Sequence, residues 1–354
     1  TYPLITYTGG TLSSGLLLST GSFGGYGATL VWAPNAVNLR IDSAPVLTSG
    51  TVASATVGSA FSFQLTADNY PTAYTASPLP AGLTINPATG LISGTATSGG
   101  IYNVGISAVN GGGSASATLV LMVTPQVTRT PAQTVLAAGG SITFNAGTLG
   151  GSSTLQWYRD GVAISGATSS SYTINPLVGT EEGAYEVRLS GSGQTLAASA
   201  GSLSVISIAQ QPAGLVVIPE NPFTLSVSAN CAQPLSYQWY KNGAALSGQT
   251  GTLYSVASAD TTSPGTYTVA VSAGSATLVS APAVVQLGPG VTSPLNVSGY
   301  VFAPFSYQIT GSGSPTSYSA AGLPSGLSLD PVTGLISGMP TSSGTTLVLS
   351  LIHI

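Results

Sequence analysis

The sequence Gln-Trp-Tyr-Arg-Asp-Gly at residues 156–161 returns as Gln-Trp-Tyr-Lys-Asn-Gly at residues 238–243. Asp-Gly and Asn-Gly are favoured in two-residue hairpin turns, because both central residues of such a turn adopt positive φ. An aromatic run before the turn is typical of a strand, in which successive side chains point to opposite faces. The repeat therefore predicts two copies of one β-module, each with a buried tryptophan and an outward-facing tyrosine.

Further matches recur at the same spacing of 82 residues, and they include Gly183/Gly265, Tyr185/Tyr267 and Val187/Val269. A buried tryptophan on one strand and a tyrosine two residues before an inward position of another strand resemble the immunoglobulin domain. The resemblance implies two immunoglobulin-like sandwiches, over residues 126–207 and 208–287. The predicted core residues are Trp157, Trp239, Phe144, Val187, Val227, Val269, Tyr185 and Tyr267.

Immunoglobulin domains usually carry a disulfide between two of these inward positions. The chain has one cysteine, Cys231, so no intrachain disulfide can form. The resemblance places apolar pairs there instead, Phe144 with Val187 and Val227 with Val269. Losing a disulfide costs about 2–5 kcal/mol, and each large buried apolar side chain contributes roughly 1.5–3 kcal/mol. We therefore expect packing against the tryptophan to replace the covalent bond.

A second repeated motif occurs once before and once after the first pair of repeats. Leu-Pro-Ala-Gly-Leu-Thr-Ile-Asn-Pro-Ala-Thr-Gly-Leu-Ile-Ser-Gly at residues 79–94 returns, with conservative changes, at residues 323–338. Its prolines fix φ and its glycines allow positive φ, which predicts tight turns between short strands. The pattern resembles the bacterial "putative Ig" family of surface-protein domains. It implies cadherin-like sandwiches at residues 44–125 and 288–354, the second of them truncated.

The two ends of the chain differ from these modules. Residues 1–43 alternate as strands do, with runs near Leu16 and Leu30, and resemble the end of passenger regions built from autotransporter-associated β-strand repeats. Similarity between the two outer modules runs to Val348. Residues 349–354 match nothing in the first copy and are also encoded by the end of a transposon-derived sequencing adapter, so we expect an assembly artefact. The last sandwich is then expected to lack counterparts of residues 105–124 and to leave a strand edge unpaired.

Charged residues make up 4% of the chain, against about 25% in average globular domains. The five basic residues are scattered and the net charge is −4. No patch could neutralise several phosphates, which argues against nucleic-acid binding. No apolar run approaches the ~18 residues that span a bilayer, so we expect no membrane insertion in this segment.

Residues able to support catalysis are scarce. The only histidine is His353, and no Ser-His-Asp, Cys-His or metal-binding set can be assembled around it. Adjacent Glu181 and Glu182 are expected to lie in a solvated corner loop. These observations predict that the chain is not an enzyme and holds no cofactor. The nearest candidate for calcium is Asp68-Asn69, although calcium usually needs more than one carboxylate.

The sequence thus predicts an all-β chain of tandem immunoglobulin-like and cadherin-like sandwiches, joined by short proline-containing linkers such as residues 124–126 and 288–290. We expect a structural spacer or stalk in a large extracellular or cell-surface bacterial protein, whose partners are neighbouring domains of the same polypeptide. The alternative is an adhesive module that binds a surface glycan or protein through loops or an exposed sheet. Tyr158 and Tyr240 are the candidate ligand contacts, because strand alternation turns them outward.

Overall fold

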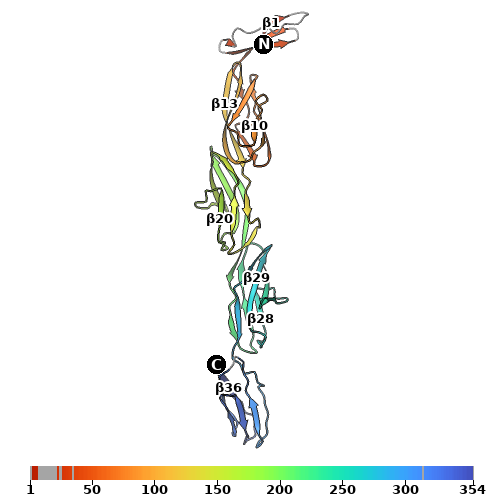
Figure 1. Cartoon of the computed structure of the whole chain (residues 1–354), viewed down its shortest axis with the longest axis vertical. Helices are drawn as coiled ribbons and strands as arrows, with labels where there is room; N and C mark the ends of the chain where they lie inside the picture. Colours follow the sequence, from red (N-terminus) through yellow and green to blue (C-terminus); the bar gives the residue numbers. More distant parts are fainter. Residues whose placement is uncertain (1, 7–21, 24–25, 34–35, 313–314, 354) are drawn as a thin grey trace. The chain divides into compact units, whose positions relative to one another are not determined.

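A computed structural model describes residues 2–6, 22–23, 26–33, 36–312 and 315–353. Every regular element in these ranges is a β-strand (Figure 1). Within them, no helix is long and apolar enough to cross a membrane. The chain divides into two compact units, residues 1–134, 140–176 and 182–203 in the first and residues 135–139, 177–181 and 204–354 in the second.

The N-terminal segment forms a four-stranded antiparallel sheet in the order β1-β4-β3-β2. Its strands are β1 (Tyr2–Thr6), β2 (Ser22–Phe23), β3 (Tyr26–Ala33) and β4 (Ala36–Asp42). β3 and β4 pair from Ala33 opposite Ala36 to Gly27 opposite Asp42. The predicted strand near Leu16 lies outside the described residues.

The first sandwich has two packed sheets, β10-β11-β7 and β9-β12-β13-β6, and a small pair, β5-β8. Its strands are β5 (Val46–Leu47), β6 (Val52–Thr56), β7 (Ala60–Gln64), β8 (Ala67–Asp68), β9 (Ala73–Ser77), β10 (Leu83–Ile85), β11 (Leu91–Thr95), β12 (Gly99–Asn110) and β13 (Gly113–Thr124). Inward residues of both sheets form one core, which includes Leu65, Tyr74, Ile92, Val104, Ile106, Leu119, Leu121 and Val123. The repeated motif at residues 79–94 supplies the turn between β10 and β11.

That turn depends on an Asx side chain and a glycine. Asn86 Oδ1 accepts hydrogen bonds from the amides of Ala88 (3.0 Å) and Thr89 (3.2 Å). Gly90 has φ of 73°, and a Cβ there would lie 2.8 Å from the Leu65 carbonyl oxygen. In the fourth sandwich, Asp330 accepts from Val332 and Thr333 in the same way.

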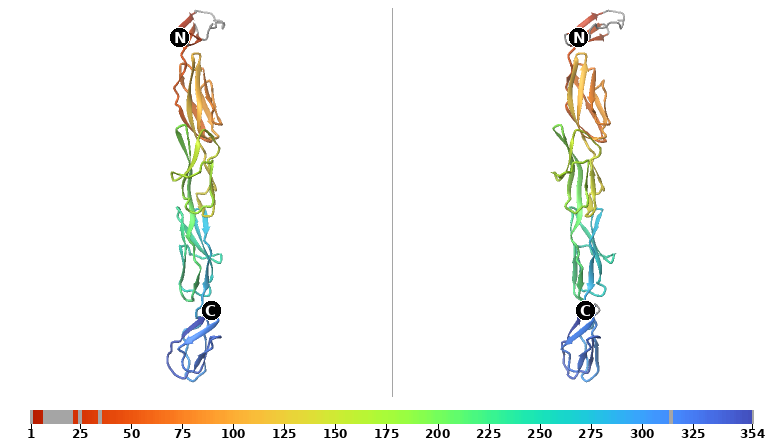
Figure 2. Two further views of the ribbon diagram at one scale, coloured as in Figure 1. Left: turned by 90° about the vertical axis from the view of Figure 1, so that its left-hand side faces the viewer. Right: turned by 60° about the vertical axis from the view of Figure 1, so that its left-hand side comes forward.

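The second and third sandwiches repeat one plan, with strands in two layers (Figure 2). The second uses β14 (Thr128–Thr130), β15 (Val135–Ala137), β16 (Ile142–Asn145), β17 (Leu149–Gly151), β18 (Thr154–Arg159), β19 (Val162–Ala163), β20 (Ser171–Ile174), β21 (Gly183–Gly191) and β22 (Gln194–Gln210). The third uses β23 (Leu215–Val217), β24 (Phe223–Ser226), β25 (Ser228–Asn230), β26 (Ser236–Lys241), β27 (Ala244–Ala245), β28 (Leu253–Val256), β29 (Gly265–Ala273), β30 (Ala276–Val279) and β31 (Ala283–Leu287).

Each of these two cores is centred on its tryptophan. Trp157 and Trp239 have no exposed surface. Each indole Nε1 donates to a backbone carbonyl, Ser169 O or Gly251 O, at 2.9 Å. A buried indole N–H without a partner would cost stability, so this bond lets a polar aromatic ring occupy the centre of the core.

The residues expected to replace the disulfide are buried, but their pairing differs from the expectation in the third sandwich. Phe144 lies opposite Tyr172 in the β16–β20 pair, and Leu225 lies opposite Tyr254 in the β24–β28 pair. The counterpart of Phe144 is therefore Leu225, which lies two residues before the expected Val227 on the same strand face. Trp157 follows Phe144 by 13 residues, whereas Trp239 follows Leu225 by 14, so the extra residue of the third sandwich lies between these two strands and shifts β24 away from the 82-residue spacing.

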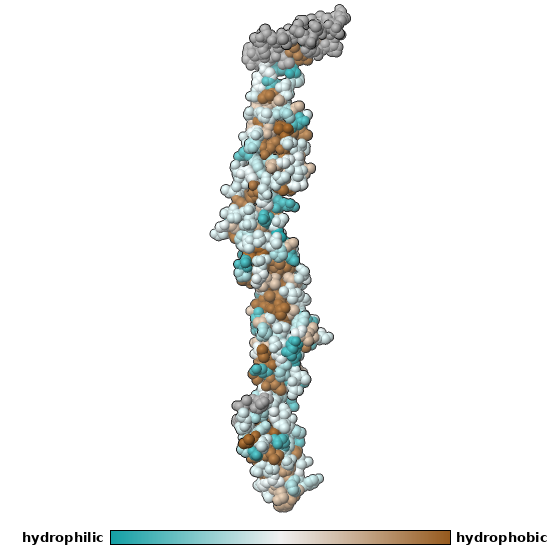
Figure 3. All heavy atoms as spheres, in the orientation of Figure 1, coloured by the Kyte–Doolittle hydropathy of each residue, from teal (hydrophilic) through white to brown (hydrophobic). Residues whose placement is uncertain are grey.

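Uncharged hydroxyl pairs cover the outer faces of the sheets. Cross-strand examples are Thr75 with Ser107, Thr143 with Thr173, Thr224 with Ser255 and Ser272 with Thr277, at 2.7–2.9 Å between oxygens. In the space-filling view most of the surface is pale, with hydrophilic and hydrophobic residues scattered among residues of intermediate hydropathy (Figure 3). Hydroxyl groups thus provide polar contacts between strands on a surface that has few charged side chains.

The fourth sandwich reproduces only part of the first. Its strands are β32 (Phe305–Gln308), β33 (Ser317–Ala321), β34 (Leu327–Leu329), β35 (Leu335–Gly338) and β36 (Leu349–His353). The sheet β34-β35-β32 corresponds to β10-β11-β7. The β33–β36 pair has the register of the β9–β12 pair, because Ala321 opposite Leu349 matches Ser77 opposite Gly105. The expectation that every counterpart of residues 105–124 is absent was therefore wrong for residues 105–109.

The side-chain pattern of β36 nevertheless matches that of β12 only in part. Ser350 occupies the position of Ile106, which is buried in the first core. Leu349 occupies the position of Gly105 and is 64% exposed. At the start of β36 the backbone register therefore turns an apolar side chain to solvent and places a serine at an inward position.

Replacing the central tryptophan tests the role of the core. We expect Trp157→Ala and Trp239→Ala each to reduce the free energy of unfolding by about 3–5 kcal/mol, since each removes a fully buried ring and leaves a cavity. Val162→Ala, in the hairpin that follows Trp157, is the control, because Val162 is 70% exposed and surface changes usually stay within about 0.5 kcal/mol. Chemical denaturation followed by tryptophan fluorescence and circular dichroism measures both. Equal stabilities of Trp157→Ala and Val162→Ala would contradict the assignment.

The turns at Asn86 and Asp330 predict different acid sensitivities. Hydrogen bonds from the Val332 and Thr333 amides hold the pKa of Asp330 below its usual value. The turn is therefore stabilised above the ordinary aspartate pKa of about 3.9, and this contribution is lost as the pH falls through the lower folded-state pKa. Hydrogen exchange of residues 327–338 should accelerate in acid relative to Asp330→Asn at the same pH. Residues 83–94, which carry Asn86, should respond equally in both proteins.

Candidate functional site

The repeated hairpin motif is built residue by residue. The side-chain amide of Gln156 donates to the carbonyls of Trp157 (2.9 Å) and Ile164 (2.5 Å). In the third sandwich, the amide of Gln238 donates to the carbonyls of Trp239 (2.8 Å) and Leu246 (2.7 Å). The glutamine thus joins the two sides of the hairpin, which gives it a structural role that the sequence did not reveal.

The turn residues of the hairpin also connect it to the next strand. Asp160 and Asn242 have φ of 50° and 49°, and each is followed by a glycine with positive φ. Asp160 Oδ1 accepts from the Ala184 amide (2.8 Å), and Asn242 Oδ1 accepts from the Thr266 amide (2.9 Å). Asx residues suit this position because they tolerate the left-handed conformation and also offer an acceptor.

Tyr158 follows the buried Trp157 on β18 and is half-buried. The guanidinium carbon of Arg188 lies 4.0 Å from its ring centroid. Glu186, directly opposite Tyr158 on β21, accepts a hydrogen bond from Arg188 Nε at 2.8 Å. An arginine over an aromatic ring and bound to a carboxylate forms a compact polar cluster on an otherwise weakly charged sheet.

Tyr240 occupies the equivalent position of the third sandwich in a different setting. Thr268 lies opposite Tyr240, and Ala270 lies opposite Gln238, where the second sandwich has Glu186 and Arg188. Tyr240 is half-buried as well. The two tyrosines therefore share a backbone position but present different chemistry, a charged cluster at Tyr158 and a neutral surface at Tyr240.

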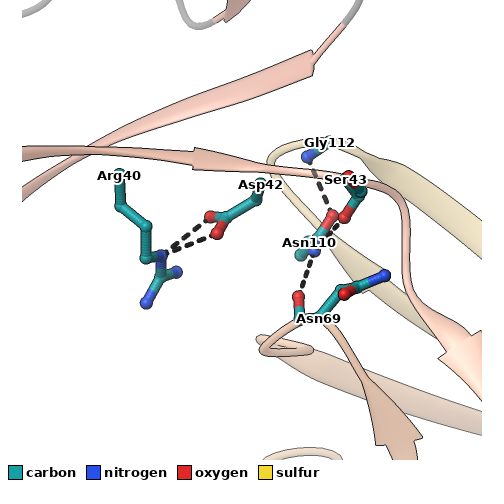
Figure 4. Close-up of polar contacts among 6 residues, drawn as sticks. All are labelled: Arg40, Asp42, Ser43, Asn69, Asn110 and Gly112. Atoms are coloured by element: carbon teal, nitrogen blue, oxygen red, sulfur yellow. Dashed lines mark hydrogen bonds and ion pairs between the residues drawn. The ribbon is translucent and has the colours of Figure 1, made fainter. Parts of the chain in front are cut away.

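Asn69, one of the two proposed calcium residues, lies beside the segment that follows β4 (Figure 4). Asn110 Nδ2 donates to the carbonyls of Ser43 (2.8 Å) and Asn69 (2.5 Å), and its Oδ1 accepts from the Gly112 amide (2.8 Å). Asn69 Nδ2 donates to the Ala44 carbonyl at 2.9 Å. These amides tie the segment after β4 to two loops of the sandwich.

Acidic ligands do not converge at this point. Asp68 is exposed, and Asp42 is buried in an ion pair with Arg40, whose guanidinium carbon lies 5.0 Å from the Tyr70 ring centroid. Among the residues that the structure describes, no three His, Cys, Asp or Glu side chains gather to hold a metal. The geometry at Asn69 is that of a hydrogen-bonded joint.

The other candidates take structural positions. The carboxylate of Glu181 accepts from the amides of Val178 and Gly179, both at 2.9 Å, and from the Thr180 hydroxyl. Partial burial would raise the pKa of Glu181, but these hydrogen bonds outweigh it and the pKa is lowered. Cys231 is half-buried beside a small apolar cluster. The side chain of His353 lies outside the described residues.

Tyr267 closes the corner that precedes β29 in the third sandwich. Tyr267 is 1% exposed, and its hydroxyl donates to the Ser263 carbonyl at 2.8 Å. Lys241 Nζ lies 5.5 Å from the same ring and also donates to the Thr262 carbonyl. Lys241, the basic residue of the repeated motif, therefore stabilises the loop before Tyr267 by contacting both its backbone and the tyrosine ring.

Comparison with known proteins agrees with this geometry. The family described as "Putative Ig domain" matches residues 44–124 and 288–351. The fold is that of tandem immunoglobulin-like β-sandwiches. No curated protein sequence matches it.

Several solved structures align with the chain. An I-band fragment of titin is 16% identical over 69% of this chain and 98% of that chain, with a TM-score of 0.29. Extracellular domains 3–5 of Drosophila OTK are 12% identical over 73% of this chain and 100% of that chain, with a TM-score of 0.29. The N-terminal eight Ig domains of Down syndrome cell adhesion molecule are 13% identical over 91% of this chain and 52% of that chain, with a TM-score of 0.25.

A double-mutant cycle tests the cluster on the second immunoglobulin-like domain. The cycle compares the parent, Tyr158→Ala, Arg188→Ala and the double variant. We expect Arg188→Ala to lower the free energy of unfolding more when Tyr158 is present than when it is replaced by alanine. The coupling energy should be about 0.5–1 kcal/mol, the range for partly exposed cation–π pairs. Tyr240→Ala combined with Arg188→Ala is the control and should be additive. A zero coupling between Tyr158 and Arg188 in urea denaturation would contradict the interaction.

Proposed function

We propose that the chain is a non-catalytic spacer, a series of immunoglobulin-like modules that positions other domains of a large extracellular or cell-surface bacterial protein. The observation that carries the proposal is the way consecutive modules are joined. Within each compact unit, neighbouring modules are connected by backbone hydrogen bonds, and in one joint also by buried side chains, in addition to the covalent chain. Joints of this kind resist bending, which is what a spacer requires.

The joint in the first unit is a parallel strand pair. β12 of the first sandwich pairs with β17, from Gly99 opposite Leu149 to Ile101 opposite Gly151. The Gly99 amide donates to Thr148 O at 2.9 Å, and the Ser152 amide donates to Ile101 O at 3.0 Å. The sheet therefore continues across the module boundary.

Glycines make this close approach of two backbones feasible. A Cβ on Gly100, whose φ is 150°, would lie 2.1 Å from the Gly150 carbonyl oxygen. A Cβ on Gly151 would lie 2.3 Å from the Ile101 carbonyl oxygen. Real Cβ atoms do not approach other atoms so closely, so any larger residue would separate the strands.

The second unit contains two further joints. Val135 and Ile206 form a buried cluster with Val271 and Ala273 of β29, and residues 207–210 of β22 pair with β25. At the start of the fourth sandwich, the Gly288 amide donates to Val217 O at 2.6 Å. Each joint thus buries apolar surface or satisfies backbone groups that a free linker would leave to water.

Further support comes from composition and resemblance. The chain has five lysine and arginine residues in 354, which limits cleavage by trypsin-like proteases outside the cell. The resemblance to surface-protein domains, and of residues 1–43 to passenger repeats, favours an exported bacterial protein. An adhesive role is the alternative, and the neutral surface at Tyr240 is the observation that favours it.

Binding measurements on the whole chain separate the two functions. We expect no saturable binding to glycan arrays or to cell surfaces up to high micromolar concentration. Saturable binding that Tyr240→Ala abolishes, while Tyr158→Ala retains it, would instead establish the adhesive function. Circular dichroism of both variants confirms that the fold is intact.

The joint in the first unit can be tested by distance measurements. Spin labels at Ala88→Cys and Val162→Cys, in a Cys231→Ser background, report the separation of the first two sandwiches. We expect a narrow distance distribution in the parent protein and a broad one after Gly100→Ala, because the new Cβ pushes the strand pair apart.

Gly50→Ala is the matched control. A Cβ at Gly50 would lie 3.9 Å from its nearest neighbour, the Val52 carbonyl oxygen, so this change should leave the distribution narrow. A distribution already broad in the parent would contradict a stiff joint. A distribution still narrow in Gly100→Ala would show that the strand pair is not what stiffens it.

A further inference from the structure

We propose that the bond between Arg40 and Ile41 is a processing site for an arginine-specific protease of the trypsin type. Cleavage there separates the N-terminal sheet from the sandwiches that follow. Lysine and arginine occur at five positions of the chain, 40, 129, 159, 188 and 241. Arg40 alone precedes the first sandwich, so a cut after Arg40 leaves every sandwich whole.

Three of the other basic residues are shielded by strands on both sides. A protease of this type binds its substrate as an extended strand, which requires a free main-chain edge. Arg159 lies between β21 and β19, Arg188 lies between β18 and β22, and Lys241 lies between β29 and β27. The backbone at these three positions therefore offers no free edge.

Arg129 lies on an edge strand but is a poor substrate. Its strand β14 pairs with β16 on one side. Pro131, the second residue after the bond to be cut, has no N–H with which to pair with a protease. The Arg129 guanidinium also donates to the carbonyl of Ser202 at 2.7 Å and to that of Ala132 at 3.2 Å. Both features disfavour cleavage after Arg129.

Arg40 combines a basic side chain with an open main-chain edge. β1 pairs with β4 only from Ala36 to Leu39, whereas β3 pairs with β4 as far as Asp42. Among the described residues, one edge of residues 40–42 therefore has no strand partner. Ile41, which follows the bond to be cut, is 36% exposed. A protease strand can add at this edge.

Two contacts of the Arg40 side chain keep the site closed. Arg40 Nε lies 2.8 Å from Asp42 Oδ1, and Asp42 is only 3% exposed (Figure 4). The guanidinium carbon lies 5.0 Å from the Tyr70 ring centroid. We call these two contacts the Arg40 latch. Since a trypsin-type protease receives arginine in a pocket that contains a carboxylate, the guanidinium must leave the latch before cleavage.

The backbone of Tyr70 makes the latch releasable. Tyr70 has φ of 56° and is 70% exposed, and a bulky residue in this left-handed region is strained unless its surroundings hold it there. The surroundings include a hydrogen bond from Asn110 Nδ2 to the Asn69 carbonyl at 2.5 Å. An exposed and strained residue can separate from Arg40 by local opening while the sandwich core stays folded.

The reaction at the open site is peptide hydrolysis. The C–N bond between Arg40 and Ile41 breaks, and one water molecule is consumed. Its oxygen enters the new carboxyl group of Arg40, and its hydrogen goes to the new amino group of Ile41. The protease supplies the catalytic groups, so the chain itself contributes only the arginine, the open strand edge and the latch.

Limited digestion of the whole folded chain with trypsin, followed by intact mass spectrometry, tests the proposal. No lysine or arginine lies between Arg40 and Arg129, so a fragment beginning at Ile41 identifies the cut without ambiguity. We expect this fragment to form first and to accumulate before any cut at the other four basic residues.

A change at Tyr70 tests the latch. Cleavage follows the population of the open form when opening and closing are fast. Tyr70→Ala should therefore speed the cut after Arg40 by roughly two- to fivefold, which corresponds to the loss of one exposed cation–π contact. Tyr70→Phe keeps the ring over the guanidinium and is the matched control, so it should be cleaved at the rate of the parent.

Three results would overturn the proposal. The first is a cut at any other basic residue before the cut after Arg40, or no cut after Arg40 in the folded chain. The second is an equal rate for Tyr70→Ala and the parent. The third is simultaneous cleavage at all five basic residues, because that pattern would show that global unfolding, and not the latch, exposes Arg40.

Discussion

The two central sandwiches depend on one polar contact inside an apolar core. An indole ring brings more apolar surface to the centre of a small domain than any other side chain, but it also brings an N–H that must be satisfied. Trp157 and Trp239 solve this in the same way, by donating to a carbonyl twelve residues later in the chain. That bond fixes the ring, the ring fixes the position of the aromatic and branched residues around it, and the domain needs no covalent cross-link.

Much of this arrangement follows from the sequence, because it rests on local rules. Alternation predicts which way Trp157 and Tyr158 point, and the Asp-Gly and Asn-Gly pairs predict the hairpins. Where insertion changes the spacing, local rules fail. Leu225, rather than Val227, is the counterpart of Phe144, since the copies differ in length between the repeat's landmarks. Register in a strand is decided by its partner, which a single sequence does not display.

Contacts between distant segments were the least predictable. The sequence suggested proline-containing linkers between modules, whereas the joint in the first unit is a strand pair. The only sequence feature that accompanies this pair is a set of glycines near Gly100 and Gly150. Glycine is common throughout the chain, so those positions carry no distinctive signal until their partner is known. The charged cluster of Tyr158, Glu186 and Arg188 was missed for a similar reason, because its members are brought together by pairing of strands far apart in sequence.

The hydroxyl pairs across the sheets have a consequence for where such a protein can work. Ion pairs on a surface are screened by dissolved salt and disappear when one partner changes its protonation state. The hydroxyl bridges Thr143–Thr173 and Thr224–Ser255 carry no net charge, and neither hydroxyl gains or loses a proton in the ordinary pH range. The cohesion that these bridges add between neighbouring strands is therefore the same in dilute water and in brine, and it does not change with pH in the ordinary range.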